Sequence, residues 1–104
     1  MTFEELEKKV IEWGEERGLY HPTNGTNLIA QYDKLNEEFG ELGEAIHVGT
    51  DQADVEDAIG DMMVVLTHIA RLAGLDLFRC YVAAYLQIKD RKGKMVNGIF
   101  VKES

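Results

Sequence analysis

Residues 31–61 read QYDKLNEEFGELGEAIHVGTDQADVEDAIGD and contain ten acidic residues. Eight of these form two groups: Glu37, Glu38, Glu41 and Glu44, then Asp54, Glu56, Asp57 and Asp61. Each group lies in a segment whose apolar residues recur at steps of three and four, which is helical periodicity. The first apolar stripe consists of Leu28, Tyr32, Leu35, Phe39, Leu42 and Ile46. The second consists of Val55, Ile59, Met62, Leu66, Ile69 and Ala73. The stretch therefore predicts two amphipathic helices.

The carboxylates of both segments lie beside these apolar stripes. At about 100° per residue, Glu38 and Glu41 share one edge of the first helix, and Asp57 and Asp61 share one side of the second. If the two helices pack together, four or more carboxylates converge next to a dry interface, which is costly unless a cation lies among them. Oxygen ligands select hard cations, so the pattern predicts Mg²⁺, with Mn²⁺ as a substitute.

Length and charge bound the class of protein. The chain has 104 residues, which predicts a single domain over residues 1–104. Its formal net charge of −8 argues against nucleic acid or an anionic membrane as the main partner. Cys80 is the only cysteine, which excludes an intramolecular disulfide and a thiolate metal cluster. The acidic start does not read as a signal peptide, and no apolar run reaches transmembrane length, so we expect a cytoplasmic protein.

Periodicity and turn residues predict four helices and a hairpin. The expected helices cover residues 2–18, 27–48, 52–73 and 77–91, with Thr2, Thr26 and Asp76 as N-caps. The short connection Gly49-Thr50-Asp51 makes the second and third helices antiparallel neighbours. Asn97-Gly98, between two β-prone runs, predicts a type I′ hairpin. The expected fold is an all-α four-helix bundle with a short C-terminal β-hairpin, assembled as a homodimer or homotetramer.

Two motifs in this arrangement resemble a known family. Glu37-Glu38-Phe39-Gly40-Glu41-Leu42 resembles the EExxE motif of the MazG-like, all-α nucleoside triphosphate pyrophosphohydrolases, and AIGDMMVVLTHIA, residues 58–70, resembles their second motif, ExxD. The resemblance extends from Trp13 to about Arg91. It implies Mg²⁺-dependent hydrolysis of a (deoxy)nucleoside triphosphate to the monophosphate and pyrophosphate, for nucleotide-pool control or housecleaning. It also implies a dimer or tetramer.

The second motif departs from the family pattern at one position. The residue three before Asp61 should be Glu, but it is Ala58. Asp57, four before Asp61, lies about 40° from it around a helix and takes the ligand role in this prediction. The predicted metal ligands are therefore Glu38, Glu41, Asp57 and Asp61. Asp54 and Glu56 remain alternatives.

The resemblance also suggests roles for other residues. Glu37 or Glu38 is expected to orient or deprotonate the attacking water. Gln31, Lys34, Lys89 and Arg91 are expected to bind the substrate, with Lys92 as a further phosphate candidate. Trp13 is expected to hold the base, with Tyr32 and Asn24 as alternatives.

Simpler interpretations apply to the same residues. Acidic helix faces are often merely solvated, Trp13 is a typical core residue, and Lys34 can form an i, i+4 surface pair with Glu38. Basic residues after the fourth helix complement its dipole. Glu44 and His47 form one ExxH, whereas a di-iron bundle needs a pair. The alternative function is a non-catalytic, acidic helical interaction module, which needs no metal.

Overall fold

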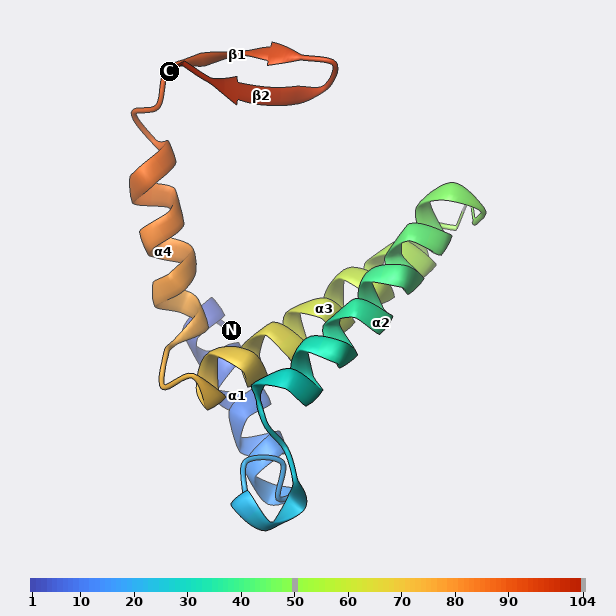
Figure 1. The fold of residues 1–104 in the computed structure, drawn as a ribbon, viewed down its shortest axis with the longest axis vertical. Coiled ribbons are helices and arrows are strands. Elements are labelled where there is room, and N and C mark those ends of the chain that lie inside the picture. The colour runs from blue at the N-terminus through green and yellow to red at the C-terminus, as the bar shows by residue number, and fades with distance from the viewer. Residues whose placement is uncertain (50, 104) are drawn as a thin grey trace.

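Four helices followed by one two-stranded hairpin make up the chain (Figure 1), as a computed structural model that describes residues 1–49 and 51–103 shows. The elements are α1 (Phe3–Glu16), a 3₁₀ turn η1 (Pro22–Asn24), α2 (Leu28–His47), α3 (Gln52–Leu72), α4 (Leu77–Ile88), β1 (Gly93–Val96) and β2 (Ile99–Lys102). The predicted all-α class with a C-terminal hairpin is confirmed. Thr50, part of the predicted connection between α2 and α3, lies outside the described residues.

Side-chain caps begin the helices. Thr2 accepts a hydrogen bond from the Glu5 amide at 3.1 Å, and Asp76 accepts one from the Arg79 amide at 3.3 Å, so both predicted caps are confirmed. The predicted cap of α2, Thr26, is wrong. Asn27 has the extended backbone of a cap and its side chain accepts from the Ala30 amide at 2.8 Å.

The chain after α4 turns earlier than predicted. The helix ends at Ile88 rather than Arg91. Ile88 is the last apolar residue before the charged residues 89–92, which have no apolar side chain to pack against another helix. Asn97 and Gly98 both have positive φ, 51° and 82°, and Val96 pairs with Ile99. A two-residue turn with positive φ at both positions is what a type I′ hairpin requires, so that prediction is confirmed.

The helices form an open arrangement within one chain. Figure 1 shows α2 and α3 running side by side in opposite directions, while α4 leaves α3 at 99°. Among the described residues, α2 packs on no helix but α3, and the two strands pack only on each other. The radius of gyration is 16.2 Å, whereas a compact domain of this length has about 13 Å. The four helices therefore do not close into a bundle within a single chain.

The buried face of α3 differs from the predicted stripe. Ala58 and Val65 are buried, whereas Ile59, a predicted stripe residue, is 51% exposed. The middle of α3 is apolar on most sides, so periodicity alone did not fix which side meets α2. On α2 the stripe is only half covered: Leu35 and Leu42 are half-buried, but Phe39 is 63% exposed.

A buried carboxylate ties the start of α4 to α1. Both oxygens of Glu7 accept backbone hydrogen bonds, from Leu77 at 2.6 Å and Phe78 at 3.2 Å, across a sequence separation of 70 and 71 residues. Burial raises the pKa of Glu7, and the nearby Asp76 carboxylate adds to that rise. The contact fixes the direction in which α4 leaves the other helices.

An aromatic cluster joins the C-terminal half of α3 to α1 and to the loop that follows it. The His68 ring is buried, its Nδ1 lies 2.7 Å from the Tyr20 hydroxyl, and the Trp13 ring stacks on it at 6.1 Å. Burial lowers the pKa of His68.

No single helix in the described part of the chain is both long and apolar enough to cross a membrane. α3 and α4 reach that measure only when counted together across their 99° bend.

We expect Glu7→Ala to destabilise the fold by about 1–3 kcal/mol, because it leaves two part-buried amides without an acceptor. The measurement is urea unfolding followed by circular dichroism. Glu12→Ala, at an exposed position of the same helix, is the matched control. Equal midpoints for the two variants would contradict the role given to Glu7.

Stability should fall as the pH drops below about 6.5, the usual pKa of histidine, because the unfolded chain then takes up a proton that folded His68 resists. The experiment compares urea midpoints at pH 7.5 and 5.5. His68→Gln should reduce the loss on acidification, and the exposed-site variant His47→Gln should not. An unchanged pH dependence in His68→Gln would argue against a buried neutral imidazole.

Candidate metal centre

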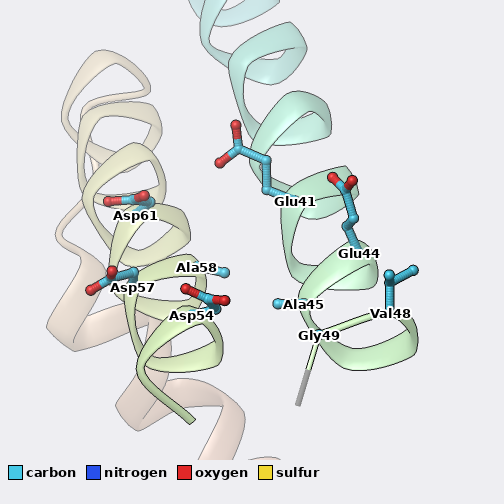
Figure 2. A pocket seen from close by; sticks show the side chains of 9 residues that line it. All are labelled: Glu41, Glu44, Ala45, Val48, Gly49, Asp54, Asp57, Ala58 and Asp61. Carbon is cyan, nitrogen blue, oxygen red and sulfur yellow. The ribbon is translucent and has the colours of Figure 1, made fainter. Parts of the chain in front are cut away.

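Two small residues face each other between α2 and α3. Figure 2 shows the side chains of Ala45 and Ala58 facing one another across the gap between the helices. Beside them is an open pocket of about 520 Å³, which has an acidic lining. Its residues are Glu41, Glu44, Ala45, Val48, Gly49, Asp54, Asp57, Ala58 and Asp61.

Three carboxylates converge beside this pocket, of which Glu41 and Asp61 line it and Glu38 does not. Glu38, Glu41 and Asp61 each offer one oxygen, and these three oxygens lie within 4.8 Å of one another. Glu38 is only 6% exposed, and its Oε2 is buried with no hydrogen-bond partner. Glu41 and Asp61 are exposed to solvent. The structure thus brings together three of the four residues that the sequence suggested as metal ligands.

Lys34 offsets part of this negative charge. Its Nζ lies 3.3 Å from Glu38 Oε1 and 3.4 Å from Glu37 Oε1, and these two contacts raise the pKa of Lys34. The neighbouring Glu38 carboxylate raises the pKa of Glu41, first through a shared hydrogen bond and then through charge repulsion. Like charges are therefore held together here without full compensation.

These features fit a divalent cation. The Oε2 atom of Glu38 is a buried acceptor that needs a donor or a cation, and Glu38 is the only buried carboxylate of the three. The donor set consists of carboxylate oxygens alone, which suits a hard cation. The three residues together could hold such an ion.

Asp57 lies apart from this trio. It lines the pocket, but its carboxylate does not belong to the group of oxygens within 4.8 Å of one another. Figure 2 shows Asp57 and Asp61 extending to the same side of α3, whereas Asp54 and Ala58 face α2. The residue three before Asp61, Ala58, is thus the one that points toward the neighbouring helix. Glu56 is exposed and does not line the pocket.

The predicted substrate residues are scattered over the molecule. Gln31 is half-buried one turn before Lys34 on α2. Trp13 lies on α1 against His68, with the Arg17 guanidinium 4.3 Å from its ring centre, and it does not line the carboxylate pocket. Lys89 and Arg91 follow α4, which makes no contact with α2 in the described residues.

The positions of Ala45 and Ala58 in the wall of the pocket were not predicted. Both are small residues, and the sequence around them does not show which side of each helix faces its neighbour. The pairing of Tyr20 with His68 was also missed, because a loop residue gives no periodic signal.

Compared with models of protein families, with curated proteins and with solved structures, the chain gives no match. The resemblance to MazG-like proteins therefore stays a prediction.

Mg²⁺ or Mn²⁺ should raise the melting temperature of the wild-type protein, because an ion that binds only the native state stabilises it by about 2.7 kcal/mol at 100 times its dissociation constant. Asp61→Asn should remove most of this shift. Asp57→Asn is the matched control and should keep it, since its carboxylate lies outside the trio. A shift that depends on Asp57 and not on Asp61 would place the ion elsewhere.

Proposed function

We propose that this protein is a MazG-like hydrolase that converts a (deoxy)nucleoside triphosphate into the monophosphate and pyrophosphate with the help of a divalent cation. The observation that carries the proposal is the buried, unpartnered Oε2 of Glu38 beside Glu41 and Asp61. The order of the acidic motifs along α2 and α3 supports the same class. A cytoplasmic location fits it, because nucleotide pools are found there.

Glu38, Glu41 and Asp61 would hold Mg²⁺, or Mn²⁺ in its place. When bound, the ion neutralises phosphate charge and lowers the pKa of a bound water. Without it, an acidic pocket would repel a triphosphate, so these three side chains make binding conditional on the cation.

Glu37 and Lys34 are suited to the remaining work. Glu37 is exposed, lies next to the trio without belonging to it, and can accept the proton of the attacking water. The water oxygen forms a bond to phosphorus, the anhydride bond between the α- and β-phosphates breaks, and pyrophosphate leaves with the bonding electrons. Lys34 can turn from Glu37 toward a phosphate oxygen, where its charge offsets that of the substrate.

The proposal includes a homodimer or homotetramer. Tyr32, Phe39 and Ile46 on α2 are 59%, 63% and 59% exposed, and they recur every seven residues along one side of the helix. A row of this kind is typical of a helix that packs on a further helix. In the described chain no such helix covers them.

The test is a panel of ribo- and deoxyribonucleoside triphosphates with Mg²⁺ and chromatographic separation of products. We expect a monophosphate and pyrophosphate as first products, and Asp61→Asn should lower the rate by about 100-fold or more. Asp57→Asn should keep most of the rate.

A diphosphate and orthophosphate as first products would contradict the proposed bond cleavage. No turnover on any substrate, together with an unchanged melting temperature in Mg²⁺, would instead favour the non-catalytic interaction module, which the exposed apolar row on α2 also suits.

A further inference from the structure

Opposite charges are collected on two separate arms of the chain. We call α2 and α3, residues 28–72, the acidic arm, and α4 with the hairpin, residues 77–102, the basic arm. The acidic arm has ten carboxylates and two Lys or Arg residues, for a net charge of −8, and the basic arm has six Lys or Arg residues and one carboxylate, for a net charge of +5. Figure 1 shows the two arms diverging from the region around α1.

The two arms do not meet within one chain. α4 packs only on α1 and on the end of α3, and the strands pack only on each other, as far as the structure describes the chain. Glu7 binds the amides of Leu77 and Phe78, and this contact fixes the start of α4 in a direction away from its own α2. The charge complementarity is therefore unused inside a single copy.

Both arms also expose apolar side chains along their length. On the acidic arm these are Tyr32, Phe39 and Ile46, and the basic arm exposes Tyr81, Tyr85, Leu86, Ile88, Met95 and Phe100. The row on α2 is bordered by carboxylates, whereas α4 has Arg79 as its only charged residue and is followed by the other five cations of the arm. Exposed apolar side chains next to charge are typical of a protein interface.

The exposed surface is large enough for such an interface. The chain exposes 8124 Å², whereas a compact monomer of this length exposes about 5,900 Å². The excess exceeds the roughly 800 Å² that each partner buries in a stable complex of standard size.

The length of α4 sets how much of the acidic arm it can cover. α2 has 20 residues and extends about 30 Å at 1.5 Å per residue, whereas α4 has 12 residues and extends about 18 Å. Figure 1 shows the hairpin lying across the far end of α4 rather than continuing its axis. The α4 helix of one copy can therefore lie along more than half of the α2 helix of the other, with the hairpin at its end.

We propose that two copies of this chain exchange their basic arms, so that α4 and the hairpin of each copy lie along the acidic arm of the other. The apolar rows then cover each other. Lys89, Arg91 and Lys92 of one copy come to the carboxylate pocket of its partner, where the charges of opposite sign are concentrated.

The exchange also changes the charge at the carboxylate site. This consequence rests on the proposed function. In one copy, Lys34 is the cation that pairs with the carboxylates of the trio within the described residues. The arm of a second copy adds further cations, which suits a substrate with several phosphate charges. Each site is then built from both copies.

The direct test is chemical cross-linking. In a Cys80→Ser background, which has no other cysteine, Glu44→Cys and Lys92→Cys are introduced in two differently tagged chains that are mixed and refolded. A bis-maleimide should join the two tags. The control replaces Lys92→Cys with Glu5→Cys on α1, and it should give no more cross-linked product than unmixed chains. Circular dichroism checks that each variant folds.

The result decides between a second copy and other occupants of the basic arm. When both cysteines are in one chain, exchange predicts a covalent dimer. A cross-link within the chain would show that the arm folds back on its own α2 and would overturn the proposal. The proposal also fails if no product exceeds the control, an outcome that leaves the arm to an unlike partner such as a nucleic acid. These cross-linking results do not depend on enzymatic turnover or on a bound metal ion.

Mixed dimers then test the shared site. The Asp61→Asn variant and the double variant Arg91→Ala/Lys92→Ala are each expected to hydrolyse substrate slowly when tested alone. Mixing equal amounts should restore about one quarter of the wild-type rate, because half of the symmetric dimers are mixed and each has one intact site. Cross-linking with no activity in any sample would defeat the proposed function and leave the exchange standing. If both variants are active alone and mixing them does not raise the rate, the proposal of a site shared by two copies is wrong.

Discussion

The packing of α2 on α3 brings the acidic residues of both helices next to each other. Ala45 and Ala58 face each other across the pocket between the two helices, and oxygens of Glu38, Glu41 and Asp61 lie within 4.8 Å of one another beside it. Glu38 is the most affected of these residues, because one of its carboxylate oxygens is buried without a hydrogen-bond partner. The same contact that buries apolar surface therefore creates the electrostatic demand for a cation.

The local parts of the fold could be predicted because their causes are local. A Thr or Asp before a helix satisfies amides three residues away, and Asn97-Gly98 tolerates positive φ with no help from the rest of the chain. The side of a helix that meets its neighbour has a different cause. Ala58 and Asp57 lie on opposite sides of Asp61, and only the position of α2 decides between them.

The open arrangement of the helices could not be predicted from the sequence for a related reason. An apolar stripe such as that of α2 predicts that another helix packs on it, but it does not show whether that helix belongs to the same chain or to a second copy. Leu35 meets α3, while Phe39 is left exposed on the far edge of the same stripe. Periodicity treats the two alike, because it measures angle around one helix and has no information about the number of partners.

The contact between Glu7 and the start of α4 also bears on the order of folding. Residues 28–72 form a hairpin of neighbouring helices, and local contacts of this kind form rapidly. Glu7 finds its partners 70 and 71 residues later in the chain. On folding, the acidic hairpin can therefore form first, and the direction of α4 is set last. The carboxylates are then gathered before the cations of residues 89–102 take up their final positions.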